Sequence, residues 1–297
     1  MTKAGRAGGA RRTGGGTHKV LVTGGSSGIG AATALAFAAR GFPVAVTGLD
    51  DGGGLREVAS QAGGVSIPGD LRERGCPRRV VEAAAEALGG LDVVVSNAGQ
   101  GWRGPFAAMT DDDIDSLLDL NLRASAQVAR AALAHLPPGT GHLVFVGSIA
   151  GLLGVPGEAW YSATKAGLGM LADVLRTELR ADGIRVTLVV PTVVDTAFYE
   201  RRNSPYLRRR PRPISPQVVA DAIVEAVERG REVVVIPGWV CWPVRLRANF
   251  PGLYRLLERR LDSQNGWREQ PPRDVVDGPS QPEKDGQPPI DPIRPAV

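Results

Sequence analysis

The stretch that decides the fold is Val20-Leu21-Val22-Thr23-Gly24-Gly25-Ser26-Ser27-Gly28-Ile29-Gly30. A short apolar run enters a glycine-rich turn, and an alanine-rich segment of helical character follows at residues 31–40. Glycines in such a turn let the backbone approach a pyrophosphate, whose charge is stabilised by the N-terminus of the helix. The stretch therefore predicts a dinucleotide-binding turn, with candidate cofactor contacts at Gly24, Ser26, Ser27, Gly28, Ile29 and Gly30.

The same turn also matches the G-x-S-x-G nucleophile elbow of α/β-hydrolases, with Ser26 as the nucleophile. That mechanism needs an acid and then a histidine later in the chain. The only later histidines are His135, within a predicted helix, and His142, at the start of a predicted strand. The elbow also leaves Gly30 unexplained, so we favour the dinucleotide turn.

Short apolar runs alternate with longer amphipathic segments along the rest of the chain. Strands are predicted at 20–22, 44–46, 65–67, 91–96, 143–147, 184–190 and 232–236, and helices at 31–40, 55–62, 78–88, 111–136, 158–181 and 216–229. This alternation predicts βαβ units, and the continuous Val/Leu/Ile runs indicate strands buried on both faces. We expect a single α/β domain, a doubly wound parallel sheet of about seven strands (a Rossmann fold), with ligands at the carboxyl ends of the strands.

Composition divides the 297 residues into four segments. A basic arm at 1–17 and a Pro-rich tail at 263–297 are expected to be disordered, because neither has enough apolar residues to form a core. Between them lie the catalytic domain at 18–238 and an amphipathic extension at 239–262. Most of the net charge of +4 comes from the arm, so the charge does not predict nucleic-acid binding.

The sequence does not indicate a metalloprotein, a disulfide-stabilised protein or a membrane-spanning protein. Two cysteines and three histidines are scattered without metal-ligand spacing, so we predict no metal. The first 20 residues lack the apolar region of a signal peptide, and no apolar run of about 18 residues is present. We expect a cytoplasmic protein, at most peripheral to a membrane.

Tyr161 and Lys165 lie four residues apart in a predicted helix and therefore on one face. An ammonium beside a phenol favours the phenolate and lowers the phenol pKa, which suits a proton donor and acceptor for a carbonyl or alcohol. Ser148 ends the fifth predicted strand and should meet this pair at the same edge of the sheet.

These residues, with Asn97-Ala98-Gly99 after the fourth strand and Asn121 in the next helix, resemble the motifs of the short-chain dehydrogenase/reductase family. The resemblance covers about residues 17–240. It implies an oxidoreductase that moves hydride between NAD or NADP and a carbonyl or secondary alcohol. A non-catalytic dinucleotide-binding sensor or scaffold on the same fold is the alternative, and the intact Ser148, Tyr161 and Lys165 set argues against it.

The resemblance also implies a role for each motif residue. Tyr161 would be the general acid/base, Ser148 would bind the reacting oxygen, Lys165 would bind the nicotinamide ribose, and Asn121 would fix a helix kink and an ordered water. Further implied cofactor contacts are Asp70, Leu71, Asn97, Ala98, Gly99, Val194 and Thr196. The family also implies a homodimer or homotetramer, formed through helices 111–136 and 158–181.

Two positions depart from the family pattern. Thr192 follows Pro191 where the family commonly has glycine, so the local turn is expected to differ. After the second strand, Gly48 replaces the acid typical of NAD-dependent members and Leu49 the base typical of NADP-dependent ones. Asp50 could still bind the ribose and favour NAD. The choice between NAD and NADP therefore stays open.

The substrate side has two interpretations. The loop at 192–214 contains six arginines and two acids, which suits an anionic substrate such as an acyl thioester, or a solvated loop. Its aromatic residues and Trp102 suit an apolar alcohol or ketone instead. The extension at 239–262 fits a cover over the substrate mouth, a subunit contact or a membrane surface. Pro243 and Pro251 break its pattern and weaken the membrane interpretation.

Overall fold

The computed structural model describes residues 18–49, 52–202, 204, 206 and 211–262. The basic arm, Asp50, the arginines at 208–210 and the tail from 263 lie outside the described residues. The side chains of 258–262 are likewise outside them.

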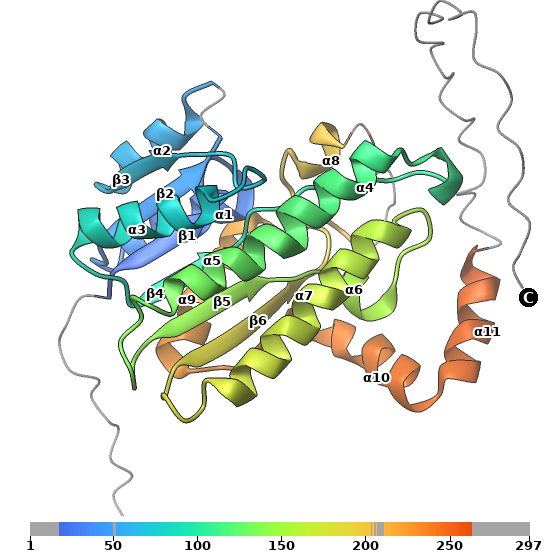
Figure 1. The fold of residues 1–297 in the computed structure, drawn as a ribbon. Coiled ribbons are helices and arrows are strands. Elements are labelled where there is room, and N and C mark those ends of the chain that lie inside the picture. The colour runs from blue at the N-terminus through green and yellow to red at the C-terminus, as the bar shows by residue number, and fades with distance from the viewer. Residues whose placement is uncertain (1–17, 50–51, 203, 205, 207–210, 263–297) are drawn as a thin grey trace, which may run out of the picture.

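A seven-stranded parallel sheet forms the centre of the molecule, in the order β3-β2-β1-β4-β5-β6-β7 (Figure 1). Its strands are β1 (Val20–Thr23), β2 (Val44–Gly48), β3 (Val65–Pro68), β4 (Val93–Ser96), β5 (His142–Val146), β6 (Arg185–Pro191) and β7 (Val233–Ile236). The strand order reverses between β1 and β4, which is the topological switch point where doubly wound sheets bind ligands. The predicted fold class is confirmed.

Helices cover both faces of this sheet because its central strands are apolar on both sides. One face packs against α3 (Cys76–Leu88), α5 (Ser125–Ala132) and α7 (Ala159–Glu178). The other packs against α1 (Gly28–Ala38), α2 (Gly54–Gln61) and α9 (Pro216–Arg229). The two resulting cores fix the carboxyl ends of the strands relative to one another.

The helix predicted at 111–136 is divided by a π-helical turn. It consists of α4 (Asp111–Leu118), the π-helical turn η2 (Asp119–Ala124) and α5. Apolar periodicity continues through all three, so sequence pattern alone does not reveal the turn. The helix begins at Asp111, as predicted, and the side chain of the N-cap residue Thr110 accepts a hydrogen bond from the backbone N–H of Asp113.

Several short elements were not predicted. These are η1 (Phe106–Ala108), α6 (Ile149–Leu153), α8 (Phe198–Arg201) and η3 (Gly238–Val240). The extension forms two helices, α10 (Cys241–Asn249) and α11 (Pro251–Asp262), which reach out from the body of the molecule beyond α6 (Figure 1). None of the described helices is long and apolar enough to cross a membrane.

Candidate active site

A cavity of about 570 Å³ opens at the carboxyl edge of the sheet. The carboxyl ends of β1 to β6, or the segments that follow them, all contribute to its wall, which includes Gly24, Gly48, Gly69, Asn97, Ser148 and Thr192. The loop after β6 and the start of the C-terminal extension complete the wall on the opposite side. The fold thus gathers the predicted motifs around one space.

The glycine turn fits tightly under this cavity. A Cβ at Gly30 would lie 2.1 Å from the carbonyl oxygen of Gly24, so no side chain fits there. Gly24 and Gly28 have φ of +65° and +57°, in the left-handed region that glycine adopts without strain. The turn therefore brings bare backbone to the N-terminus of α1, as a pyrophosphate site requires.

Hydrogen bonds tie the glycine turn to the strand beside it. Asn97 donates from Nδ2 to the carbonyl of Thr23 at 2.9 Å, and the Thr23 hydroxyl accepts from the backbone N–H groups of Asn97 and Ala98. Thr23 was not predicted as a site residue, although it opens the motif. Its buried hydroxyl links β1 to the segment after β4 and so fixes the floor of the cavity.

Tyr161 and Lys165 project from the first turns of α7 and are buried. Lys165 donates from Nζ to the carbonyl of Val146 at 3.0 Å and lies 6.0 Å from the centroid of the Tyr161 ring. Ser148, at the N-cap of α6, hydrogen-bonds the Tyr161 side chain. The three predicted catalytic side chains therefore meet at the cavity wall.

Burial controls the proton affinities of this pair. It raises the pKa of Tyr161 above its ordinary value, a shift that the hydrogen bond with Ser148 partly offsets. Burial also lowers the pKa of Lys165 to about 8. The Tyr161 pKa is therefore raised and not lowered as expected, because burial is its largest influence and the groups that lower it are Ser148 and Arg202.

Asn121 lies in the π-helical turn, behind the cavity wall. Its Oδ1 accepts from the backbone N–H of Gln100 at 2.9 Å, and its Nδ2 donates to the carbonyl of Gln100 at 2.9 Å and to Thr164 Oγ1 at 3.2 Å. Thr164 lies next to Lys165 in α7. Asn121 thus joins the segment after β4 to the helix that carries Tyr161.

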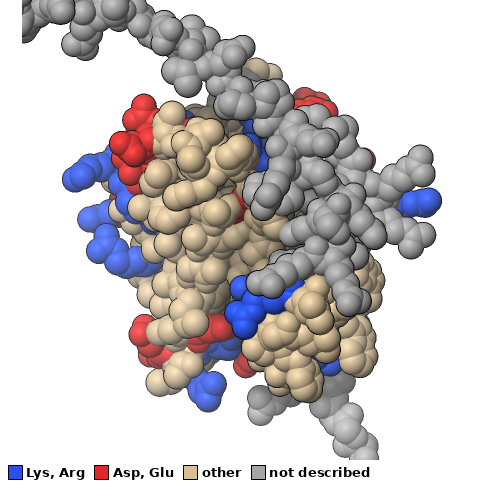
Figure 2. All heavy atoms as spheres, turned by 90° about the vertical axis from the view of Figure 1, so that its right-hand side faces the viewer, with Lys and Arg blue, Asp and Glu red and all other residues tan. Residues whose placement is uncertain are grey.

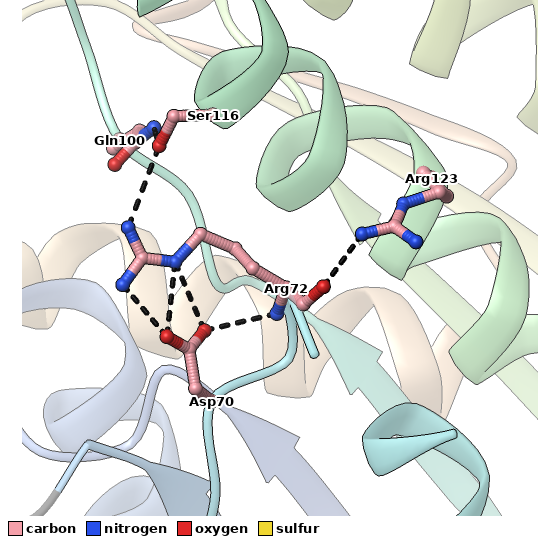
Figure 3. Close-up of polar contacts among 5 residues, drawn as sticks. All are labelled: Asp70, Arg72, Gln100, Ser116 and Arg123. Carbon is pink, nitrogen blue, oxygen red and sulfur yellow. Dashed lines mark hydrogen bonds and ion pairs between the residues drawn. The ribbon is translucent and has the colours of Figure 1, made fainter. Parts of the chain in front are cut away.

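Asp70 follows β3, and a neighbouring arginine binds its carboxylate (Figure 3). Arg72 donates from Nη2 to Oδ2 at 2.7 Å and from Nε to Oδ1 at 3.0 Å. This contact lowers the pKa of Asp70, so the carboxylate is ionised at neutral pH. Arg72 also donates to Ser116 Oγ, which accepts from Gln100 Nε2 as well, so α4 links the segment after β3 to the segment after β4.

The loop after β6 covers the glycine turn. Thr196 lies against Gly28, where an added Cβ would be 3.1 Å from Thr196 Cγ2. Arg201, on α8, donates from Nη1 to Ser27 Oγ at 3.0 Å. Val194 is buried and pairs with Ile214 across the loop. Arg201 was not predicted to lie on the cofactor side, because its partner Ser27 is 174 residues away in the chain.

Aromatic residues and one ion pair line the substrate side of the cavity. The Tyr161 ring centroid is 5.8 Å from that of Phe198, which is 5.5 Å from that of Tyr199. Arg202 lies over Tyr199, with Cζ 4.6 Å from the ring centroid, and binds the buried carboxylate of Glu158. Trp102 was expected to line the cleft, but it packs beside it against the small apolar cluster that includes Tyr161.

Nearly all predicted site residues surround this cavity. Those in its wall are Gly24, Ser26, Ser27, Gly28, Ile29, Asp70, Leu71, Asn97, Ala98, Gly99, Ser148, Tyr161, Lys165, Val194 and Thr196. Gly30 and Asn121 support the wall from behind, and Asp50 lies outside the described residues. Among the described residues no group of His, Cys, Asp and Glu could hold a metal ion.

The short chain dehydrogenase family model matches residues 18–206. The chain is 33% identical over 224 residues to an uncharacterized oxidoreductase of Staphylococcus aureus (strain MRSA252), covering 74% of this chain and 95% of that one. The chain belongs to the short-chain dehydrogenase family. This short-chain dehydrogenase is also 34% identical over 248 residues to an uncharacterized oxidoreductase of Myxococcus xanthus, covering 81% and 96% of the two chains.

Solved structures agree with this assignment. A short-chain dehydrogenase from Burkholderia cenocepacia in complex with NADP is 31% identical, with a TM-score of 0.69 over 75% of this chain and 97% of that one. A second, from Sphingobium yanoikuyae in complex with NADPH, is 25% identical, with a TM-score of 0.66 over 88% and 99%. The chain is therefore an NAD(P)-dependent oxidoreductase of this family.

Proposed function

We propose that this short-chain dehydrogenase interconverts a carbonyl compound and a secondary alcohol, with Tyr161 as the general acid/base. The observation that carries the proposal is the meeting of three side chains, Ser148, Tyr161 and Lys165, in the wall of one cavity that also contains the glycine turn. An aromatic wall beside Tyr161 favours an apolar or aromatic substrate.

The residues present fit a nicotinamide dinucleotide. The bare backbone of the turn at 24–30 would bind the pyrophosphate, and Asp70 and Leu71 would meet the adenine. Asn97, Ala98 and Gly99 would line the dinucleotide, Lys165 would bind the nicotinamide ribose, and Val194 and Thr196 would meet the amide. The bound cofactor supplies or accepts the hydride.

The chain's own residues supply the proton. Because burial raises the Tyr161 pKa, its phenol is protonated at neutral pH and can donate to the carbonyl oxygen in the direction of reduction. Ser148 would hydrogen-bond the same oxygen. Lys165, with a pKa of about 8, is mostly an ammonium at pH 7 and stabilises the phenolate that is left. Asn121 would fix the π-helical turn and an ordered water that returns the proton.

Screening is the direct test. NADH and NADPH oxidation would be followed with aryl ketones, sterol ketones and acyl thioesters. We expect turnover of at least one apolar ketone. Absence of turnover across such a panel, with tight binding of either dinucleotide, would favour a non-catalytic sensor or scaffold instead.

We further propose a cytoplasmic homodimer or homotetramer built on α4, α5 and α7. Met170 and Val174, one turn apart on α7, are large apolar side chains exposed to 64% and 46%, which supports a subunit contact there. Light scattering on the purified chain gives its mass. A monomer at micromolar concentration would contradict the proposal.

A further inference from the structure

The segment 239–257, here called the C-terminal surface, carries a concentration of exposed apolar side chains. Thirteen large apolar residues of the described chain are exposed, and six of them fall in these 19 residues. They are Trp239, Trp242, Phe250, Leu253, Leu256 and Leu257, with Trp242 the most exposed at 72%. An apolar patch this concentrated on a soluble domain marks an interaction surface.

The prolines that weakened the membrane interpretation do not break the helices. Pro251 is the first residue of α11, and Pro243 lies in the first turn of α10. Backbone N–H groups of a first turn have no partner within the helix, so proline is tolerated there. The segment therefore forms two helices, of which α11 is amphipathic.

Helix α11 packs against little of the molecule. From Pro251 to Leu257, Tyr254 is the only side chain that is even partly buried. Leu253, Leu256 and Leu257 follow the i, i+3, i+4 spacing of one helix face, and all three are exposed. A helix of twelve residues is marginal in water on its own, so this face is suited to being covered.

The positive charge of the C-terminal surface helps to decide between a second copy of the chain and a membrane as its partner. Arg245, Arg247 and Arg255 lie within it, and residues 237–257 contain no aspartate or glutamate. On the side toward which α11 projects, blue Lys and Arg groups lie among tan residues, which carry no charge, and red Asp and Glu groups lie at other places on the same face (Figure 2). The remainder of α11 adds two arginines and two acids, so residues 239–262 contain five arginines and two acids. A second copy would present the same excess of arginines, so self-association through this surface is disfavoured.

We propose that the C-terminal surface docks onto an anionic lipid membrane. Tryptophan and leucine side chains would enter the interface between headgroups and acyl chains, and the arginines would contact the lipid phosphates. Neither helix crosses the bilayer, so the attachment is peripheral and reversible. Both the apolar area and the charge contribute to binding.

Docking would place the catalytic cavity at the lipid surface. Trp239, Val240 and Pro243 line that cavity, so its wall is continuous with the C-terminal surface. A second cleft of about 330 Å³ separates α10 and α11 from the loop after α6, and Leu153 and Val155 line both spaces. An apolar substrate dissolved in the membrane would thus reach Tyr161 without crossing open water.

Flotation of the full chain with lipid vesicles tests the proposal. The protein is expected to float with vesicles of equal parts phosphatidylglycerol and phosphatidylcholine. A much smaller fraction of the protein should float with pure phosphatidylcholine vesicles. The variant Trp242→Ser/Leu253→Ser/Leu256→Ser should lower partitioning onto the anionic vesicles by about tenfold or more. The matched control, Phe106→Ser/Val218→Ser/Val233→Ser, removes three exposed apolar side chains that lie outside the C-terminal surface, the cavity wall and the proposed subunit contact, and it should leave binding unchanged.

Three outcomes would overturn the proposal. The wild type could fail to float with anionic vesicles, or the serine variant could bind as well as the wild type, which would assign binding to another segment such as the basic arm. In the third outcome, the wild type does not bind vesicles and the serine variant has a lower mass in light scattering than the wild type, which would make the C-terminal surface a subunit contact. Turnover of a water-soluble ketone should be the same in wild type and variants, which shows that the site is intact.

Discussion

Arg202 donates from Nη1 to Oε1 of Glu158 at 2.8 Å, and both side chains are almost fully buried in the wall of the catalytic cavity. The pair joins the loop after β6 to the start of α7, one turn before Tyr161. Glu158 raises the pKa of Tyr161 and Arg202 lowers it, both less than burial does. The two charges of the ion pair therefore have opposite effects on the pKa of Tyr161, the proposed general acid.

Breaking this ion pair should destabilise the fold. In Arg202→Met the buried carboxylate of Glu158 keeps only its 4.0 Å contact with Arg103, which should cost up to about 3–5 kcal/mol of the free energy of unfolding. In the double variant Arg202→Met/Glu158→Gln the buried carboxylate is removed as well, and only its longer, 4.0 Å contact with Arg103 is lost in addition, so most of the stability should return. Urea unfolding of the three proteins checks this. Equal stability of the single and double variants would show that the pair is not coupled.

Lys165 should make stability depend on pH in the alkaline range. Its pKa in the fold is about 8, below its ordinary value of 10.5, so above pH 8 the unfolded chain holds more protons than the native protein. Stability contributed at this site therefore rises with pH between about 8 and 10.5. Lys165→Met removes this titration. At pH 7 the variant should therefore gain up to about 3 kcal/mol in the free energy of unfolding, reduced by the loss of the hydrogen bond to the carbonyl of Val146.

The difference between Lys165→Met and the wild type is the quantity to measure, because other groups titrate in the same range. Burial raises the pKa of Cys76 and of Tyr199, and both contributions lower stability with increasing pH. They cancel in the difference. A gap between the two proteins that is constant from pH 7 to 10 would contradict the assigned Lys165 pKa.

A base after β2 should set the cofactor preference. Gly48 and Leu49 line the cavity and carry no charge, and Leu49 is 45% exposed. Leu49→Arg places a guanidinium where the family holds a 2′-phosphate, and a charge-assisted hydrogen bond of about 1.5–3 kcal/mol should shift the preference about tenfold or more toward NADPH. Kd values for NADH and NADPH measure this, with Leu49→Gln as the uncharged control. An equal shift in Leu49→Gln would refute the electrostatic cause.

The sequence predicted the parts of the site that follow from chain order. Strand ends in a parallel sheet meet at one edge, so the order of the strands along the chain was enough to place Asn97 and Ser148 near the glycine turn. The helical spacing of Tyr161 and Lys165 also indicated their shared face. Apolar runs located all seven strands, because strands buried on both faces need no alternation.

The remainder depends on tertiary contacts between distant segments. The contact of Arg201 with Ser27 and that of Arg202 with Glu158 arise where a long loop folds back over the sheet. No local pattern marks them. The family resemblance implied a helix kink at Asn121, but its π-helical form was not visible because the amphipathic pattern runs through it unchanged. The Tyr161 pKa was misjudged because burial is not visible in helical spacing.

The central claim is that Tyr161 transfers the proton, and Tyr161→Phe tests it most directly once a ketone substrate has been found. The measurement is kcat for ketone reduction, together with the Kd of the preferred dinucleotide. We predict that kcat falls about 10²–10⁴-fold while the Kd stays nearly unchanged, because the variant keeps the ring and removes only the proton donor. A kcat near the wild-type value in Tyr161→Phe would contradict the account.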